Sequence, residues 1–469
     1  MTNCSKAQQQ VASGPDLSVT PRAIWRLTWP QMLMMYLMFF MGFMAVWVAG
    51  RISANVQAAL GMVNQCGIFL MVVSMAVSSG ATAAISQSLG ARRIACAKRY
   101  IAATVTGCCC LGFLVALLGW VFSEGILGII LVPEDILPHT REMWLASLPG
   151  LPAQYLYAAT GVMFRATRQV LPPLWVAAIV CLFNLLACLG LGLGWFGLPN
   201  CGYLGLVWAN VGSQYLGAIC NCLLLAHSGY LSRRTLPGVR WLKSALPYLI
   251  KVSLPAGAAS LVWQSGYMTL FVLVASLPYD SVNALAGLTA GLRVESLLFL
   301  PGMAFNMSAA VLVGNSLGEG KPEQARRIAL NMTAIAAAAL TLVAAILWPF
   351  RQELAALLAQ EAGAQQQIVS YLSYNLLSTP FSIASTVFGG VMVGAGATRY
   401  NLLIFGGSFW GLRLPLGWLL GHVLWGTSSG VFLAMLISQI LQSCVMIHAV
   451  RSWDWPRFAM RRHAPSTVR

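Results

Sequence analysis

Long apolar runs alternate with short polar segments along the whole chain. A run of about 20 apolar residues crosses the roughly 30 Å hydrocarbon core of a bilayer as a helix. The runs are long and lack the period-two alternation of barrel strands, so the pattern predicts transmembrane α-helices. We expect twelve spans, at 24–50, 55–86, 99–122, 142–164, 170–194, 203–227, 252–277, 282–315, 328–349, 368–394, 400–423 and 429–450.

The composition agrees with a chain surrounded by membrane lipids. Of the 469 residues, 58% are hydrophobic and 9% are charged, and the mean hydropathy is +0.74. Too few polar side chains remain to coat a water-soluble domain of this size. The sequence therefore predicts an all-α, multi-pass integral membrane protein.

The positive charge is distributed by side of the membrane. The net charge of +16 would suit nucleic acid, but of the 28 Lys and Arg residues only Arg51, Arg141 and Arg351 fall on the side away from the termini. Arg293 and Arg413 lie within spans, and the other 23 are on the side that holds both termini. Basic residues collect on cytoplasmic loops, so this asymmetry predicts cytoplasmic termini and excludes a nucleic-acid partner.

The polar segments divide the chain into two halves. We expect a cytoplasmic tail at 1–22, an N-terminal six-helix lobe at 23–227, a cytoplasmic linker at 228–251, a C-terminal six-helix lobe at 252–450 and a basic cytoplasmic tail at 451–469. Four landmarks repeat at offsets of 225 to 231 residues: Leu27–Pro30 with Val252–Pro255, Gln87–Gly90 with Asn315–Gly318, Thr167-Arg168 with Thr398-Arg399, and Ser213-Gln214 with Ser438-Gln439.

The repeat predicts a duplicated fold. Each half holds an even number of spans, so both copies have the same orientation, and a pseudo-twofold axis along the membrane normal relates them. Two similar bundles around one axis suit a carrier that works by alternating access. A channel needs no such pair of lobes, and a membrane enzyme rarely has one.

Four segments together resemble a known family. They are LRVESLLFLPGMAF with VGNSLGEGKPEQARR (292–327), its N-terminal echo AISQSLGARR (84–93), FRATRQVLPP (164–173) and GAGATR (394–399). The combination is similar to the multidrug and toxic compound extrusion (MATE) transporters over roughly 22–450. The resemblance implies a cation-coupled antiporter that exchanges organic, often cationic compounds for protons or sodium through a central cleft. Separately, the short tails fit a bacterial inner-membrane protein, and we expect a monomer with no cofactor beyond the ion gradient.

The sequence departs from that family at its usual coupling carboxylates. The Asp that the family often carries in the first span is matched by Ala45, and the seventh span has no carboxylate between Leu254 and Gln264. In the fifth span Asn184 matches a family Asn, but the position four residues later is Cys188. Asn184 is an ion-coupling candidate, and an interhelical hydrogen bond is the other interpretation.

Apart from Glu142 at the first position of the fourth expected span, Glu295 is the only acidic residue within an expected span. Charge inside a hydrocarbon-length segment is costly and marks a candidate functional site. A lone carboxylate there suits the binding and release of a proton. The structural alternative is a salt bridge with Arg413 or Arg293. Because Arg293 is only two residues away, the two side chains diverge on a helix, and Arg413 is the better partner.

Other side chains are candidates for the cleft or for hinges. Aromatic and amide groups that could meet an aromatic cation are Tyr36, Trp47, Trp263, Gln264 and Asn306, with ordinary core or lipid packing as the alternative. The prolines Pro30, Pro255 and Pro301 are hinge candidates, because proline breaks a helical hydrogen bond.

Several function classes are excluded or kept as alternatives. No Gly-Lys-Ser/Thr phosphate loop, clustered catalytic group or metal-ligand spacing occurs, so we expect neither an ATP-driven pump nor an enzyme nor a metal site. The alternative transporter is a flippase for a lipid-linked precursor, in which Arg293 and Arg413 would hold a pyrophosphate.

Overall fold

The computed structural model describes residues 21–129, 133, 135–232, 235 and 237–460. Most of the expected N-terminal tail, Arg233 and Arg234 of the expected linker, and residues 461–469 lie outside this part. The described chain is helical throughout and contains no strand. The prediction of an all-α membrane protein is confirmed, because ten of its helices are long and apolar enough to cross a membrane.

The helices follow the expected spans closely. They are α2 (Pro21–Ile52), α3 (Ala54–Gly90), α4 (Ile94–Val121), α5 (Ser123–Ile129), α6 (Leu137–Ser147), α7 (Leu151–Ala166), α8 (Leu171–Leu193), α9 (Gly202–His227), α10 (Val239–Ala275), α11 (Ser281–Gly318), α12 (Pro322–Leu347), α13 (Arg351–Leu358), α14 (Ala362–Ala395), α15 (Thr398–Gly406), α16 (Leu414–Trp418) and α17 (Ser428–Ser452). Short 3₁₀ turns occur at Leu148–Gly150 (η1), Trp195–Gly197 (η2) and Trp455–Phe458 (η6).

Two expected spans differ in detail from a plain apolar helix. The fourth is built from α6, η1 and α7, which follow one another from Leu137 to Ala166. The eleventh begins as α15 and contains two π-helical segments, Gly407–Arg413 (η4) and Leu419–Leu424 (η5), with α16 between them. A π-helical turn is uncommon and often marks a functional position, so the eleventh span is singled out by its backbone.

The chain forms two compact units. Unit 1 is Met1–Leu89 with Arg93–Leu249, and unit 2 is Gly90–Arg92 with Ile250–Arg469. Helix α10 begins at Val239, inside the segment expected to be a linker, and its first turns pack in unit 1. There Trp241 stacks edge-on against Tyr100 with ring centroids 4.9 Å apart, and the Tyr248 hydroxyl donates to Gln87 Oε1 at 3.1 Å.

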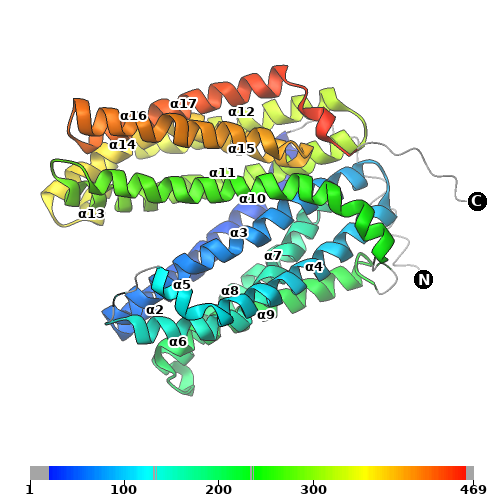
Figure 1. The fold of residues 1–469 in the computed structure, drawn as a ribbon, viewed down its shortest axis with the longest axis horizontal. Helices are drawn as coiled ribbons and strands as arrows, with labels where there is room; N and C mark the ends of the chain where they lie inside the picture. Colours follow the sequence, from blue (N-terminus) through cyan, green and yellow to red (C-terminus); the bar gives the residue numbers. More distant parts are fainter. Residues whose placement is uncertain (1–20, 130–132, 134, 233–234, 236, 461–469) are drawn as a thin grey trace, which may run out of the picture. The chain divides into compact units, whose positions relative to one another are not determined.

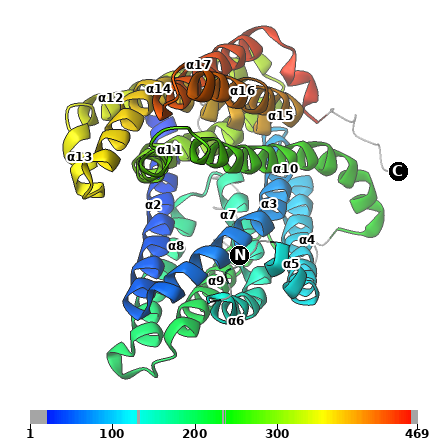
Figure 2. The same ribbon diagram turned by 60° about the vertical axis from the view of Figure 1, so that its left-hand side comes forward.

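Each unit has its own apolar core. In unit 1, α8 packs against α2 and α9, and α7 packs against α4 and α9. In unit 2, α14 packs against α11, α12 and α17 (Figures 1 and 2). Helix α14 is therefore the central helix of unit 2, and its side chains meet three neighbours.

The C-terminal ends of corresponding helices in the two halves have the same backbone conformation. Helices α3 and α11 both end in a Schellman motif, with Arg93 N–H bonded to Ser88 O at 2.9 Å and Lys321 N–H bonded to Ser316 O at 3.0 Å. The left-handed residue of this motif is Arg92 (φ 58°) in the first copy and Gly320 (φ 79°) in the second. Arg168 (φ 61°) and Gly396 (φ 76°) form a second such pair after α7 and α14.

Arg92→Gly is expected to stabilise the protein by about 0.5–1 kcal/mol, because glycine adopts a positive φ without steric cost. The reciprocal change Gly320→Ala is expected to destabilise it by a similar amount, since no other residue type shares that freedom. Thermal unfolding of the purified protein in detergent measures both. A lower melting temperature for Arg92→Gly would contradict this account of the helix end.

The residues after α17 fold back on unit 2. Trp455 is fully buried, and its indole N–H donates to Val450 O at 3.0 Å. Arg326 of α12 donates to the Trp453 carbonyl at 3.1 Å, and Tyr400 of α15 stacks on Phe458 with ring centroids 5.2 Å apart. The first part of the expected basic tail is thus a packed cap over α12, α15 and α17.

Trp455→Ala is expected to cost about 3 kcal/mol of stability, as for other large aromatic side chains removed from a core. The melting temperature of the detergent-solubilised protein measures this loss. Trp425→Ala is the matched control, since Trp425 is 48% exposed. Equal effects of the two changes would show that the cap contributes no stability.

Candidate functional site

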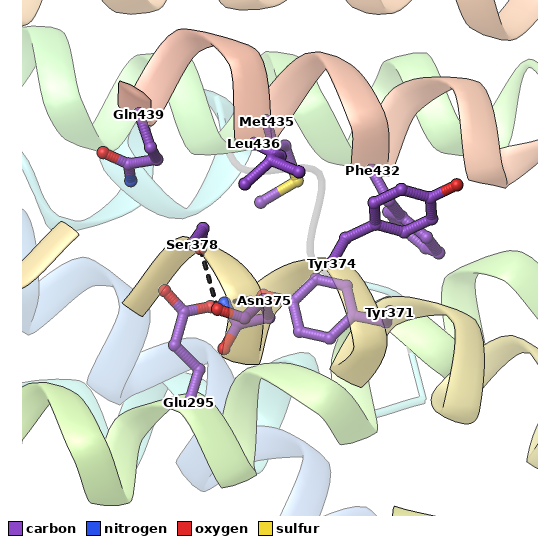
Figure 3. Close-up of a pocket in the computed structure, with 9 residues that line it drawn as sticks. All are labelled: Glu295, Tyr371, Tyr374, Asn375, Ser378, Phe432, Met435, Leu436 and Gln439. Atoms are coloured by element: carbon purple, nitrogen blue, oxygen red, sulfur yellow. Dashed lines mark hydrogen bonds between the residues drawn. The ribbon is translucent and has the colours of Figure 1, made fainter. Parts of the chain in front are cut away.

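Glu295 lies deep in unit 2, on α11. It is 14 residues beyond Ser281, where α11 begins, which is about 21 Å along the helix axis. In the ten candidate spans it is the only described carboxylate more than one turn from a helix end. The Tyr371 hydroxyl of α14 donates to Glu295 Oε2. The side chain thus points from α11 toward α14, as Figure 3 shows.

Glycines bring α11 and α14 close enough for this contact. A Cβ added at Gly291 would lie 2.1 Å from Tyr371 Cδ1, so the tyrosine ring occupies the space that a side chain would fill. On α14, a Cβ at Gly390 would lie 2.0 Å from Asn306 O, and one at Gly394 would lie 2.1 Å from Ala310 O. Gly390 and Gly394 are four residues apart, which is the small-residue spacing that lets membrane helices approach closely.

A small cavity adjoins the carboxylate between α11, α14 and α17 (Figure 3). Its volume of ≈ 10 Å³ is of the order of one water molecule, so in this conformation it admits a water or a small ion and no organic substrate. Gln439 Oε1 is buried and has no hydrogen-bond partner among the described residues. The lining residues are Glu295, Tyr371, Tyr374, Asn375, Ser378, Phe432, Met435, Leu436 and Gln439.

Arg413 is a second buried charge in the same cluster. It closes the π-helical segment η4 and is 0% exposed. Its Nε–H donates to Ser438 Oγ of α17 at 2.8 Å, and its guanidinium carbon lies 4.4 Å from the centroid of the Phe409 ring. Within the described chain, Nη1 and Nη2 form no hydrogen bond of normal geometry, although the Tyr267 hydroxyl is close. Glu295 also lies within electrostatic range of the guanidinium.

The expected charge pairs of Glu295 are not direct ion pairs. Arg413 and Glu295 share a cluster but form no salt bridge with each other in this conformation. Arg293 is exposed on α11 and pairs with no described carboxylate, which agrees with its separation of two residues from Glu295 on a helix. The carboxylate is held instead by the Tyr371 hydroxyl and by Asn375.

Asn184 occupies a polar contact in unit 1. Its Nδ2–H donates to Ser213 Oγ of α9 at 3.0 Å, and Cys188 Sγ lies 3.7 Å from its Oδ1. Asn184 is 2% exposed and both ends of its amide have partners. This geometry is that of an interhelical hydrogen bond, and an ion-coupling role for Asn184 stays a prediction.

The cleft candidates are divided between the two units. In unit 2, Trp263 belongs to an aromatic cluster with Tyr267, Phe405 and Phe409. Asn306 donates to Thr386 O at 2.6 Å, and Gln264 is half-buried. In unit 1, Tyr36 is half-buried and Trp47 is 37% exposed, with the Arg51 guanidinium 4.9 Å from its ring. That these residues line one cavity stays a prediction.

The hinge candidates all lie inside continuous helices. Pro30 is buried in α2, Pro301 is buried in α11, and Pro255 is half-buried in α10. Pro301 is six residues beyond Glu295, about 9 Å along the same helix. Two further interior prolines, Pro247 of α10 and Pro380 of α14, were not among the expected hinges. Bending at any of them stays a prediction.

The sequence did not identify the partners of Glu295 on α14 and α17. Tyr371 and Asn375 are four residues apart and so share a face of α14, which is the signal that was available. Gln439 belongs to the Ser-Gln pair that repeats at 213–214 and 438–439. The repeat drew attention to Gln439, but only the structure shows that Gln439 lines the same cavity as Glu295.

The fold and the buried polar cluster define a polytopic helical membrane protein of the transporter class, with two units of similar helix order. A family model, described as MatE, matches residues 30–189 and 255–419. These segments make up more than half of the chain and fall one in each half. The chain therefore belongs to the MATE family of membrane transporters.

Similar proteins occur in bacteria and plants. The chain is 25% identical over 389 residues to the multidrug resistance protein PmpM of Pseudomonas aeruginosa, covering 82% of this chain and 80% of that protein. It is 23% identical over 443 residues to Protein DETOXIFICATION 39 of Arabidopsis thaliana, covering 93% and 85%.

Solved structures show the same fold. A mutant of the Vibrio cholerae MATE transporter VcmN superposes with a TM-score of 0.85 at 19% identity, covering 96% of this chain and 100% of that chain. The eukaryotic MATE transporter AtDTX14 superposes with a TM-score of 0.81 at 18% identity, covering 93% and 97%. The expected fold of twelve transmembrane helices in two six-helix lobes is thereby confirmed.

Proposed function

We propose that this protein is a secondary active antiporter that exports small amphipathic or cationic organic compounds in exchange for protons or sodium by alternating access. Membership of the MATE family supports transport, and the names of PmpM and DETOXIFICATION 39 refer to multidrug resistance and detoxification. We further propose a monomer in a bacterial inner membrane with both termini cytoplasmic, which the distribution of Lys and Arg supports.

The observation that carries the coupling step is the carboxylate of Glu295 in its cavity. A half-buried carboxylate that faces a water-sized space can exchange a proton, and Asn375, Ser378 and Gln439 line the same space. The usual family carboxylates are absent from the first and seventh spans, so Glu295 is the remaining carboxylate more than one turn inside a described span. We therefore assign ion coupling to unit 2.

The flippase alternative has less support. It requires Arg293 and Arg413 to hold a pyrophosphate together, but Arg413 is 0% exposed inside unit 2 and Arg293 is exposed. Two guanidinium groups in such different surroundings do not form one anion site.

Transport of a fluorescent organic cation such as ethidium into everted membrane vesicles tests the proposal. An acidic vesicle interior is expected to drive uptake above that of vesicles without the protein, and a protonophore is expected to abolish it. Uptake driven by a sodium gradient alone would assign the coupling to sodium. Uptake equal to that of the control vesicles under both gradients would contradict export of organic cations.

A further inference from the structure

In each unit a buried side chain donates a hydrogen bond to a serine on the next span. The donor is a neutral amide in unit 1 and a charged guanidinium in unit 2. In unit 1, Asn184 of the fifth span donates to Ser213 of the sixth at 3.0 Å, and Ser213 donates on to Ala209 O at 2.6 Å. In unit 2, Arg413 of the eleventh span donates to Ser438 of the twelfth at 2.8 Å, and Ser438 donates on to Met435 O. The two serines belong to the repeated Ser-Gln pair, so the acceptors of the two contacts correspond by duplication.

The Arg413 guanidinium has more hydrogen-bond donors than the Asn184 amide, and not all of them have an acceptor. Both polar atoms of the Asn184 amide have a partner, whereas Arg413 uses Nε, and its two Nη groups form no hydrogen bond of normal geometry with a described residue, although the Tyr267 hydroxyl is close. The Arg413 side chain is 0% exposed. An unpaired buried donor costs about 1–3 kcal/mol, and a charged one costs more. An anion that accepts hydrogen bonds from the Arg413 Nη groups would remove this cost.

The nearest anion is the Glu295 carboxylate. A guanidinium and a carboxylate match as a bidentate pair, and the two groups already lie within electrostatic range. The π-helical segment η4 ends at Arg413, and a Cβ at Gly407 or Gly411 would meet no atom within 4 Å. This part of the eleventh span thus has a π-helical backbone, and its two glycines lie on the exposed side of the helix, away from the buried Arg413.

We propose that Arg413 is the internal counter-ion of the coupling carboxylate. When Glu295 holds a proton, the guanidinium rests on Ser438 and Phe409, as in this structure. When the proton leaves through the cavity, both Nη groups pair with the carboxylate, and the net charge of the cluster falls from +1 to 0. Proton rebinding breaks the pair and returns the arginine. The inference rests on the proposed antiport, and it makes the proton the coupled ion.

The other groups that face Glu295 do not supply this charge. Helix α10 contributes the Tyr267 hydroxyl, and α17 contributes the uncharged Gln439. Helix α14 contributes the uncharged residues Tyr371, Tyr374, Asn375 and Ser378. Arg413 is the one described cation in electrostatic range of the carboxylate. A second bound cation such as sodium would be repelled by it, whereas a proton bonds directly to the carboxylate oxygen.

The protonation of Glu295 can be followed without transport. Infrared difference spectroscopy of the purified protein detects the protonated carboxyl band, which is assigned by its loss in Glu295→Gln. In Arg413→Gln the band is expected to persist to higher pH, with the midpoint moved by about one pH unit or more, because an opposite charge favours the ionised carboxylate. Arg413→Lys is expected to restore most of the shift, because the charge remains.

Arg293→Gln is the matched control for this titration. It removes the same charge from the same helix as Glu295, two residues away, and is expected to leave the midpoint in place. An unchanged midpoint in Arg413→Gln, or one that Arg413→Lys does not restore, would overturn the counter-ion. Failure of vesicle uptake with a normal shift in the spectra would instead contradict only the proposed export.

Discussion

Glu295→Gln is expected to reduce uptake driven by a proton gradient to the level of vesicles without the protein. The amide has the size of the protonated carboxyl group and can accept the hydrogen bond of Tyr371, but it cannot release a proton. Downhill exchange of labelled substrate for unlabelled substrate is expected to persist, because it needs no change in protonation. Everted vesicles under an imposed pH gradient, and exchange without a gradient, measure the two activities.

Glu319→Gln is the control for this prediction. Glu319 follows α11 at its end, is exposed and pairs with Lys321 at 3.0 Å, so its loss removes a carboxylate next to the same helix from a solvated position. It is expected to transport at the wild-type rate. Full proton-driven uptake by Glu295→Gln with an unchanged pH dependence would remove Glu295 from the coupling step and leave the fold assignment intact.

The spans and the duplication could be predicted because they depend on properties that a single sequence carries. Bilayer thickness sets the length of an apolar run, and the side preference of Lys and Arg checks the number of spans. Glu295 was identifiable for a similar reason, since a carboxylate inside a long apolar run is energetically costly and therefore unusual. The four repeated landmarks were enough to define the two halves.

The partners of Glu295 could not be predicted because they depend on helix packing. Tyr371 reaches α11 only where Gly291 leaves its ring room, and glycine is common in membrane helices, so Gly291 alone did not point to this contact. The charge-pair prediction chose Arg413 because Arg293, two residues from Glu295, points away from it on the helix, and nothing in the sequence showed where the Arg413 guanidinium lies. In the structure the guanidinium contacts Ser438 and Phe409.

Gly390→Ala is expected to lower stability by about 3 kcal/mol, the upper part of the usual range for overpacking. The new Cβ would lie 2.0 Å from the Asn306 carbonyl oxygen, and a backbone atom cannot rotate away as a side chain can. Helix α11 must therefore move away from α14, which also draws Glu295 away from Tyr371. Thermal unfolding in detergent measures the stability, and vesicle uptake measures the site.

Gly407→Ala is the matched control, because a Cβ there meets no atom within 4 Å. A Cβ at position 390 has no room, whereas one at position 407 does. A similar fall in melting temperature for both variants would show that the stability of the protein does not depend on the close approach of α11 and α14.

Gly291→Ala separates the stability of the α11–α14 contact from its chemistry. Its Cβ would strike the Tyr371 ring, so the second substitution Tyr371→Leu is expected to relieve the clash and recover most of the lost stability. Proton-driven uptake is expected to stay low in the double variant, because the hydroxyl that donates to Glu295 is absent. Recovery of uptake together with stability would show that the tyrosine acts by packing alone. Because Gly291 leaves room for the Tyr371 ring, we expect it to support the proposed coupling step through that ring.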